Sequence, residues 1–416
     1  MIDQATQLRA FLYSRSNEKT CLVRLDSPFV CSLVMGYFNE RKLKWNLHTK
    51  RRRGVVYDLQ FCEYEELDWD SVLTGESRSR ACCYCVRKGM TRKAAWAQVV
   101  NKYVDKHGKD SVLGRFVPET LVISTWDAFN GDGGWLKKFG VHDKQIALNE
   151  CLYDARECFP GQFVLKPSIA SKGSEVTTVR SFEQVKQVVC EWQDCSEWVL
   201  QRYVPNLLLL NGERKFHLRV FIVCVGALQV HVFKQYIAFF ATEAYAKDGH
   251  YSHITNACQQ RDHAEFDQET VFKLPTELAK IYAKERQVAP NQAEFDFTHP
   301  QGKILQNLCT VIASSFSALK PCSAVFQPQA NCFELFGLDF LVDQNLDVHL
   351  LEFNSGPDLD QGNDGNRLGE LISSLVEGWC HLGVDPQQAD GEDSGGFVKC
   401  FDEKWAFAQH STQQVS

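Results

Sequence analysis

The chain has 416 residues, 44% of them hydrophobic, which is enough for two or three domains with cores of their own. A formal net charge of −7 at pH 7 argues against a general nucleic-acid binder, so we expect no nucleic-acid partner. The longest apolar run, Val220 to Leu228, is about half as long as a membrane-spanning helix, and no membrane contact is expected either.

The cysteine content and the first residues predict a cytoplasmic protein. The 17 cysteines form no even framework of the kind that small secreted domains use. Residues 1–20 contain no apolar core of a signal peptide.

The first ninety or so residues predict a small mixed lobe with one strongly basic stretch. This stretch, KLKWNLHTKRRR at Lys42–Arg53, carries six Lys and Arg residues and no acidic residue. It is either a dock for an acidic partner or an ordinary solvated surface.

A helix follows the N-terminal lobe. Ala95, Val99 and Tyr103 recur at four-residue spacing, which predicts a helix from about Thr91. A second helix is predicted after Ser181, a plausible cap, because Phe182, Val185, Val189 and Trp192 share one helical face.

Two strand ends lie around the second helix. QFVLKPS predicts a strand that ends at Lys166, and the small-residue loop after it contains Lys172. Backbone N–H groups and a lysine can hold a phosphate there, although an ordinary turn is the more common reason for such a loop. EWVLQRYV predicts a strand that ends before Pro205, where unpaired backbone groups can bind the edge of an adenine, although most strands that end at a proline have no such role.

The segment RKFHLRVF predicts a strand with a charged face, paired through a turn near Gly226 with the strand that follows. Lys215, His217 and Arg219 alternate along the segment and therefore share one face. Two cations and a histidine on one face suit a bound phosphate or carboxylate. The alternative is a row of solvated charges on an outer strand.

The hairpin FELFGLDFLVD…DVHLLEFN carries the most specific pattern. Alternation places Glu352 and Asn354 on one face, with Leu351 and Phe353 packing behind, and Asp339 lies on the preceding strand. Two carboxylates and an amide oxygen form a hard oxygen site that suits Mg²⁺ held with the phosphates of a nucleotide. The alternative is that the two acids pair with buried Arg or Lys.

The order of these motifs resembles the tubulin–tyrosine ligase family, which has an ATP-grasp fold. The matching motifs are TRKA, VLKPS with ASKG, QRYV, RKFHLRV, HITN, FELFGLDFLVD and LLEFNSGPD. The resemblance implies an α/β (α+β) protein with nucleotide bound between two lobes. The expected parts are a small N-terminal lobe at 1–90, a central lobe at 91–204, a C-terminal lobe with the metal site at 205–384, and a polar linker and tail at 385–416, in which FVKCF is a candidate last strand.

The resemblance also implies roles for individual residues. It implies ATP and Mg²⁺ as cofactors, with the metal on Asp339, Glu352 and Asn354. The residues implied for phosphate, adenine and substrate binding are Lys93, Lys166, Lys172, Gln201, Arg202, Tyr203, Val204, Lys215, His217, Arg219 and Asn256, of which Lys93, Lys166 and Arg219 are the candidate catalytic residues.

The implied reaction is ATP-dependent ligation of a free amino acid to a protein carboxylate through an acyl phosphate. The expected acceptor is the acidic C-terminal tail of tubulin, with tyrosine as the first choice of amino acid and glutamate or glycine as alternatives. The basic stretch would then dock the tail, and the protein would be cytoplasmic and microtubule-associated.

Three departures from the family pattern keep other functions open. His217 stands where the family usually has Asp, Lys234 in FKQY stands where an arginine is usual, and the loop SIASKGSEV is poorer in glycine. The alternatives are a catalytically weak tubulin- or microtubule-binding relative and an ATP-grasp kinase of a small molecule.

Overall fold

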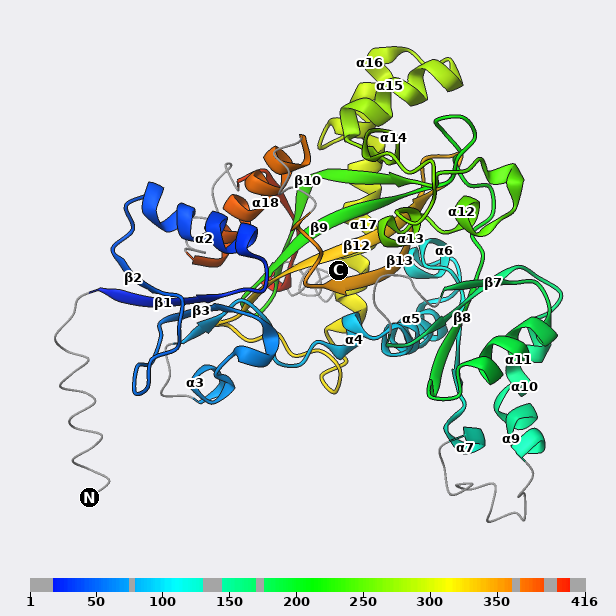
Figure 1. The fold of residues 1–416 in the computed structure, drawn as a ribbon, viewed down its shortest axis with the longest axis horizontal. Helices are drawn as coiled ribbons and strands as arrows, with labels where there is room; N and C mark the ends of the chain where they lie inside the picture. Colours follow the sequence, from blue (N-terminus) through cyan, green and yellow to red (C-terminus); the bar gives the residue numbers. More distant parts are fainter. Residues whose placement is uncertain are drawn as a thin grey trace, which may run out of the picture.

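The computed structural model describes residues 18–74, 79–129, 144–169, 176–360, 367–384 and 395–404. Three sheets follow one another along the molecule (Figure 1). The N-terminal sheet lies at one end, the largest sheet in the middle and a smaller antiparallel sheet at the other end.

The N-terminal sheet is parallel, with strand order β2-β1-β3-β4. Parallel strands need a crossover connection, and α2 supplies it between β1 and β2. This helix begins with Ser27 as its cap, whose side chain accepts from Val30 N, and with a proline in its first turn. The elements are β1 Lys19–Arg24, α2 Pro28–Glu40, β2 Trp45–His48, β3 Leu59–Cys62, a 3₁₀ turn Tyr64–Glu66, α3 Trp69–Leu73 and β4 Arg80–Ala81.

Three helices then lead to the small sheet: α4 Lys88–Thr91, α5 Lys93–His107 and α6 Val112–Phe116. The helix predicted from about Thr91 is α5, and it begins two residues later because Arg92 has extended backbone. Its inner face buries Trp96, Val99 and Val100.

The small sheet has the order β5-β8-β6-β7 and is antiparallel. Ser181 caps α11 as predicted, accepting from Gln184 N, and Val185 and Val189 are buried. Trp192 is 45% exposed, because the helix ends at Glu191 before that position. The elements are β5 Thr120–Ser124, α7 Trp126–Phe129, α9 Lys144–Cys151, α10 Tyr153–Glu157, β6 Phe163–Pro167, β7 Thr177–Val179, α11 Phe182–Glu191 and β8 Glu197–Arg202.

The largest sheet is antiparallel, with order β11-β10-β9-β12-β13, and β14 pairs with β10 as well. Gly226, at a φ of 61°, makes the predicted turn between β9 and β10, and FVKCF does form the last strand. The strands are β9 Phe216–Val225, β10 Gln229–Phe240, β11 Phe272–Lys273, β12 Phe333–Val342, β13 Val348–Ser355 and β14 Phe397–Asp402.

Long helices bury the faces of this sheet. On β9, Leu218 and Val220 join a core that includes α17, whereas Phe221 and Val223 join one that includes α18. No helix within the described ranges is long and apolar enough to span a bilayer. The helices are η2 Tyr245–Lys247, α12 His250–His253, α13 Ala257–Gln260, α14 Gln268–Val271, α15 Pro275–Arg286, α16 Pro290–Thr298, α17 Lys303–Leu319 and α18 Arg367–Val384.

A buried ion pair joins the N-terminal lobe to the largest sheet. Arg87 Nη1 contacts a carboxylate oxygen of Glu334 on β12, and the other oxygen accepts from Tyr84 N at 2.9 Å. Burial raises the pKa of Glu334 to about 7, and Arg87 opposes that rise.

We expect Arg87→Met to lower the free energy of unfolding by ~3–5 kcal/mol, because it leaves a buried carboxylate without its cation. Urea unfolding measures the change. The double variant Arg87→Met/Glu334→Gln, which removes both charges, should recover part of the loss. A single variant within ~1 kcal/mol of the unmodified protein would contradict this account of the pair.

Candidate active site

Most of the predicted site residues line one pocket between the small sheet and the largest sheet. The pocket has an empty volume of about 780 Å³. Lys93 lines a smaller cavity that shares Lys166 with this pocket. Arg219 and Asn354 are not among the lining residues, and Lys172 lies outside the described residues. The predicted residues that line the pocket are Lys166, Gln201, Arg202, Tyr203, Val204, Lys215, His217, Asn256, Asp339 and Glu352.

A row of charged residues crosses three adjacent strands at one end of the pocket. Arg219 on β9 is paired in register with Asp339 on β12, which is in turn paired with Glu352 on β13. Arg219 donates to Asp339 through Nε at 2.6 Å and Nη2 at 3.1 Å, and Asn354 Nδ2 donates to Asp339 Oδ2 at 3.1 Å. Arg219 therefore lies against a predicted metal ligand as well as beside the pocket.

Gly337 leaves space for Arg219. A Cβ atom at this position would lie 3.0 Å from Arg219 Cδ and 3.1 Å from Pro357 Cβ, closer than most real Cβ contacts. The glycine of FELFGLDF therefore leaves the space through which the Arg219 side chain reaches Asp339.

The prediction that Leu351 packs behind the hairpin is wrong. The register shifts between Asp339 and Phe340, so that β13 has one extra residue between Leu350 and Glu352. Such a bulge re-aims a side chain. As a result Leu351 lines the pocket beside Glu352, while Phe353 lies in the core as predicted.

Both acids have the cationic neighbours that the alternative interpretation foresaw. Besides the Arg219–Asp339 pair, Lys93 Nζ lies 3.6 Å from Glu352 Oε2. A carboxylate has about four lone-pair positions, so these contacts leave room for further ligands. Asn354 uses its N–H₂ group on Asp339, which leaves the amide oxygen as an acceptor.

This donor set fits Mg²⁺. The described residues contain no group of three His, Cys, Asp or Glu side chains that could form a protein-only metal cage. Mg²⁺ is usually held by one or two carboxylates together with phosphates and water, which is what Asp339 and Glu352 can offer.

His217 is buried and neutral. Its Nδ1 lies 2.6 Å from Thr255 Oγ1, its ring stacks on Phe239 at 5.0 Å, and its Nε2 lies 3.7 Å from Asp339 Oδ1. Burial lowers the pKa of His217 to about 4, although Asp339 acts in the opposite direction. The departure from Asp therefore removes a negative charge without adding a positive one. The solvated-strand alternative is wrong, because β9 is a central strand.

Two lysines are buried in the same pocket. Lys166 donates to Gln201 Oε1 at 3.0 Å, and Lys215 donates to Tyr203 Oη at 2.9 Å. Burial lowers the pKa of Lys166, and burial together with the charge of Lys166 lowers the pKa of Lys215 to about 7. An anion in the pocket would relieve both effects.

Two contacts here escaped the sequence interpretation. Asn256, expected to bind substrate, lines the pocket but also caps α13, where its Oδ1 accepts from Cys258 N at 3.0 Å. His253, the first residue of HITN, was given no role, yet its Nδ1 lies 2.9 Å from Tyr203 Oη. The motif HITN pointed to this segment, but the residue that His253 contacts, Tyr203, is 50 positions away in sequence.

The arrangement of this pocket between two antiparallel sheets defines an ATP-grasp protein. The C-terminal domain of Pby1 from K. lactis, described as an ATP-grasp enzyme that interacts with the mRNA decapping enzyme Dcp2, has the same fold. The TM-score is 0.64 at 22% sequence identity, and the match covers 92% of this chain and 99% of that one.

The family follows from the sequence comparison. The model of the tubulin-tyrosine ligase family matches residues 90–388, and the chain belongs to this family. Fold and family together define an ATP-dependent ligase, as the motif order predicted.

Similar proteins differ in their named activities. A probable tubulin–tyrosine ligase of Schizosaccharomyces pombe is 26% identical, and the match covers 77% of this chain and 82% of that protein. The probable tubulin–tyrosine ligase PBY1 of Saccharomyces cerevisiae is 25% identical, over 82% of this chain and 48% of its own length. The probable tubulin polyglutamylase TTLL9 of Rattus norvegicus is 28% identical, over 48% of this chain and 42% of its own. The chain thus spans less than half of the latter two proteins.

Proton uptake on nucleotide binding tests the protonation state of Lys215. With a pKa of about 7, this lysine is mostly neutral at pH 8, and a bound polyanion favours its charged form. We expect ATP binding at pH 8 to take up a fraction of one proton. Calorimetry in buffers of different ionisation enthalpy measures the uptake, and Lys215→Met should reduce it. Equal uptake by both proteins would assign the proton to another group.

Proposed function

We propose that the protein uses Mg-ATP to join a free amino acid to a protein carboxylate. The observation that carries this proposal is the charge in the pocket. In the pocket or directly beside it, three cationic side chains, buried or half-buried, lie near two carboxylates: Lys93, Lys166 and Arg219 near Asp339 and Glu352. This excess of positive charge is costly without an anion, and the triphosphate of ATP supplies one.

We assign a role to each of these residues from its position. Lys166 and Lys93 would bind and orient the phosphates, and Arg219 would stabilise charge on the reacting carboxylate while it holds Asp339 in place. Bound Mg²⁺, held by Asp339, Glu352 and Asn354, supplies neutralisation of phosphate charge. The carboxylate would take the terminal phosphoryl group of ATP, with release of ADP, and become an acyl phosphate. The amine of the amino acid would then attack the acyl carbon and displace inorganic phosphate, which leaves an amide bond.

We further propose the acidic tail of tubulin as acceptor in the cytoplasm, with tyrosine as the first choice of amino acid. The names of similar proteins support tubulin. They also keep glutamate and glycine as alternatives, since a polyglutamylase and a glycylase are among them.

The basic stretch Lys42–Arg53 is remote from the pocket. It lies around β2 in the N-terminal lobe, whereas the pocket lies beside β8 and β13 (Figure 1). We therefore propose that it docks the acceptor protein at a distance, and that it takes no part in the reaction.

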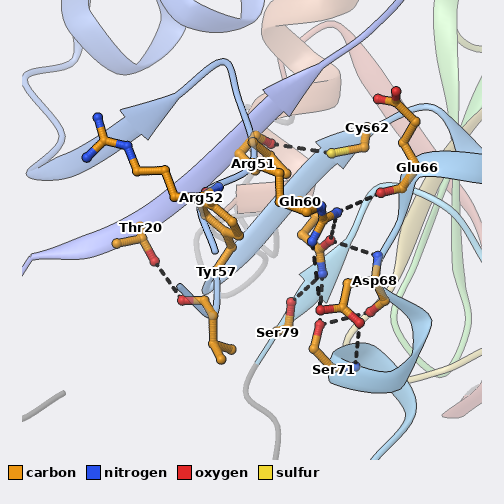
Figure 2. A network of polar contacts seen from close by, with 12 residues as sticks. Thr20, Arg51, Arg52, Tyr57, Gln60, Cys62, Glu66, Asp68, Ser71 and Ser79 are labelled. Carbon is orange, nitrogen blue, oxygen red and sulfur yellow. Dashed lines mark hydrogen bonds and ion pairs between the residues drawn. The ribbon is translucent and has the colours of Figure 1, made fainter. Parts of the chain in front are cut away.

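One arginine of this stretch has a structural role, as Figure 2 shows. Arg51 Nη2 donates to Gln60 Oε1 at 3.1 Å and to Glu66 O at 2.6 Å, and its Nη1 lies 3.7 Å from Asp68 Oδ2. Arg52, whose side chain points away from that network, is exposed, as is Arg53.

An acidic groove between the N-terminal lobe and the end of β13 makes one route for the acceptor tail unfavourable. Its empty volume is about 1130 Å³, and it is lined by Asp26, Glu63, Glu65, Asp358 and Asp360. These carboxylates repel an acidic peptide. The proposed path of the tail from the basic stretch therefore avoids this groove.

A catalytically weak, nucleotide-binding relative is the second candidate. Two observations favour it: neutral His217 replaces the usual carboxylate, and Arg219 and Asn354 already donate to both oxygens of Asp339, which leaves fewer positions for a metal. Such a protein would bind ATP without ligating an amino acid.

An incorporation assay separates the two candidates. Purified protein, Mg-ATP and detyrosinated tubulin are incubated with labelled tyrosine, glutamate or glycine. We expect one label to be incorporated and Glu352→Gln to reduce the rate by at least about tenfold, since it removes a charge from the metal site. Magnesium-dependent ATP binding without incorporation of any label would favour the second candidate.

Charge reversal tests the dock. We expect Arg52→Glu/Arg53→Glu to weaken tubulin binding about tenfold at low salt and much less at high salt, because exposed charges are screened. Arg51 stays unchanged, since its loss would disturb the network around Gln60. Lys280→Glu/Lys284→Glu on α15 is the matched control, with the same charge change on another exposed surface. Equal tubulin binding by both double variants would contradict the proposal that the basic stretch docks the acceptor protein.

A further inference from the structure

A continuous chain of polar contacts leads from Lys215 in the pocket to the surface. Lys215 Nζ donates to Tyr203 Oη at 2.9 Å, and Tyr203 Oη lies 2.9 Å from His253 Nδ1. His253 Nε2 lies 2.6 Å from Asp248 Oδ1, and Arg180 binds both oxygens of Asp248 at 2.6 and 2.9 Å.

The chemistry of the end groups sets the direction of the bonds along this series, at a Tyr203 hydroxyl that also has Tyr245 as a neighbour. The carboxylate of Asp248, which Arg180 keeps ionised, can only accept, so His253 Nε2 carries the proton. Nδ1 of the neutral ring is then an acceptor, and Tyr203 donates its hydroxyl proton to it. The hydroxyl oxygen is left to accept from Lys215, whose ammonium also lies 4.6 Å from the centre of the Tyr203 ring.

This series of polar contacts connects the two sheets that enclose the pocket. Tyr203 follows β8 and Arg180 follows β7, both in the small sheet. Lys215 directly precedes β9 of the largest sheet, and Asp248 and His253 lie in the segment that follows β10. His253 is 7% exposed, whereas the side chains of Arg180 and Asp248 are about half exposed.

The position of the chain points to the base of the nucleotide. It lies at the end of the pocket that Arg202, Tyr203 and Val204 line, away from the charged row of Arg219 and Asp339. A flexible lysine held by a fixed hydroxyl presents its remaining N–H groups in a defined direction, which reduces the entropy lost when a ligand binds.

We propose that His253 is a positioning residue for nucleotide binding: it orients Tyr203 and Lys215 toward the purine base, and the Arg180–Asp248 pair anchors it across the two sheets. This inference rests on the proposed use of ATP. It adds that affinity for the base depends on a contact network that reaches the exposed ion pair, whereas affinity for the phosphates does not.

Binding of two ligands to the full chain tests the proposal. ATP contains the base, and inorganic tripolyphosphate contains only the phosphate part. We expect His253→Phe, which keeps an aromatic ring but breaks both hydrogen bonds, to raise the Kd for ATP about tenfold and to leave that for tripolyphosphate within about twofold. His250→Phe, an exposed histidine on the same helix, is the matched control and should change neither.

Substitutions of Asp248, at the exposed end of this series of contacts, distinguish a loss of the orienting role of His253 from damage to the fold. Asp248→Asn keeps an acceptor oxygen for His253 and should retain ATP affinity within about threefold, whereas Asp248→Leu should lose about as much as His253→Phe. Unchanged ATP affinity in His253→Phe, or an equal loss for tripolyphosphate, would overturn the inference while the proposed function stands. No ATP binding by the unmodified protein would overturn both.

Discussion

The register of three strands holds the site together. Arg219, Asp339 and Glu352 meet because the register of β9, β12 and β13 places Asp339 opposite Arg219 on one side and opposite Glu352 on the other. A slip of one residue would turn these charged side chains to the opposite face of the sheet, into the apolar core that includes α17, where an unpaired charge is costly. The apolar residues that alternate with these charges therefore specify the geometry of the chemistry as well as the fold.

The burial of two lysines makes a bound anion favourable in the pocket. Lys166 and Lys215 are 6% and 7% exposed and lie near enough to repel one another, which lowers the pKa of Lys215. The folded chain gives up stability to keep these groups together, and a ligand with compensating charge recovers it. His217 fits the same balance, since a neutral ring beside Asp339 adds no charge that would need compensation.

Local patterns predicted the parts of this structure that depend on neighbours in sequence. Alternation along β9 and β13, the cap at Ser181 and the turn at Gly226 are of this kind, and together with the motif order they were enough to identify the fold. The bulge at Leu351 was missed because it depends on the pairing partner, which a single strand does not reveal. The bonds of Arg51 and His253 were missed for the same reason: a pattern indicates which face a side chain takes, but not which group lies opposite.

The last strand has a consequence for any shortened version of the protein. The family match ends at residue 388, whereas β14 begins at Phe397 and covers residues 229–233 of β10. Cutting the chain at the family boundary would remove β14 and uncover a row of backbone N–H and C=O groups flanked by Val230 and Val232. Open edges of that kind recruit strands from other molecules. A fragment trimmed to the matched region would thus keep every described residue of the pocket and yet be prone to self-association.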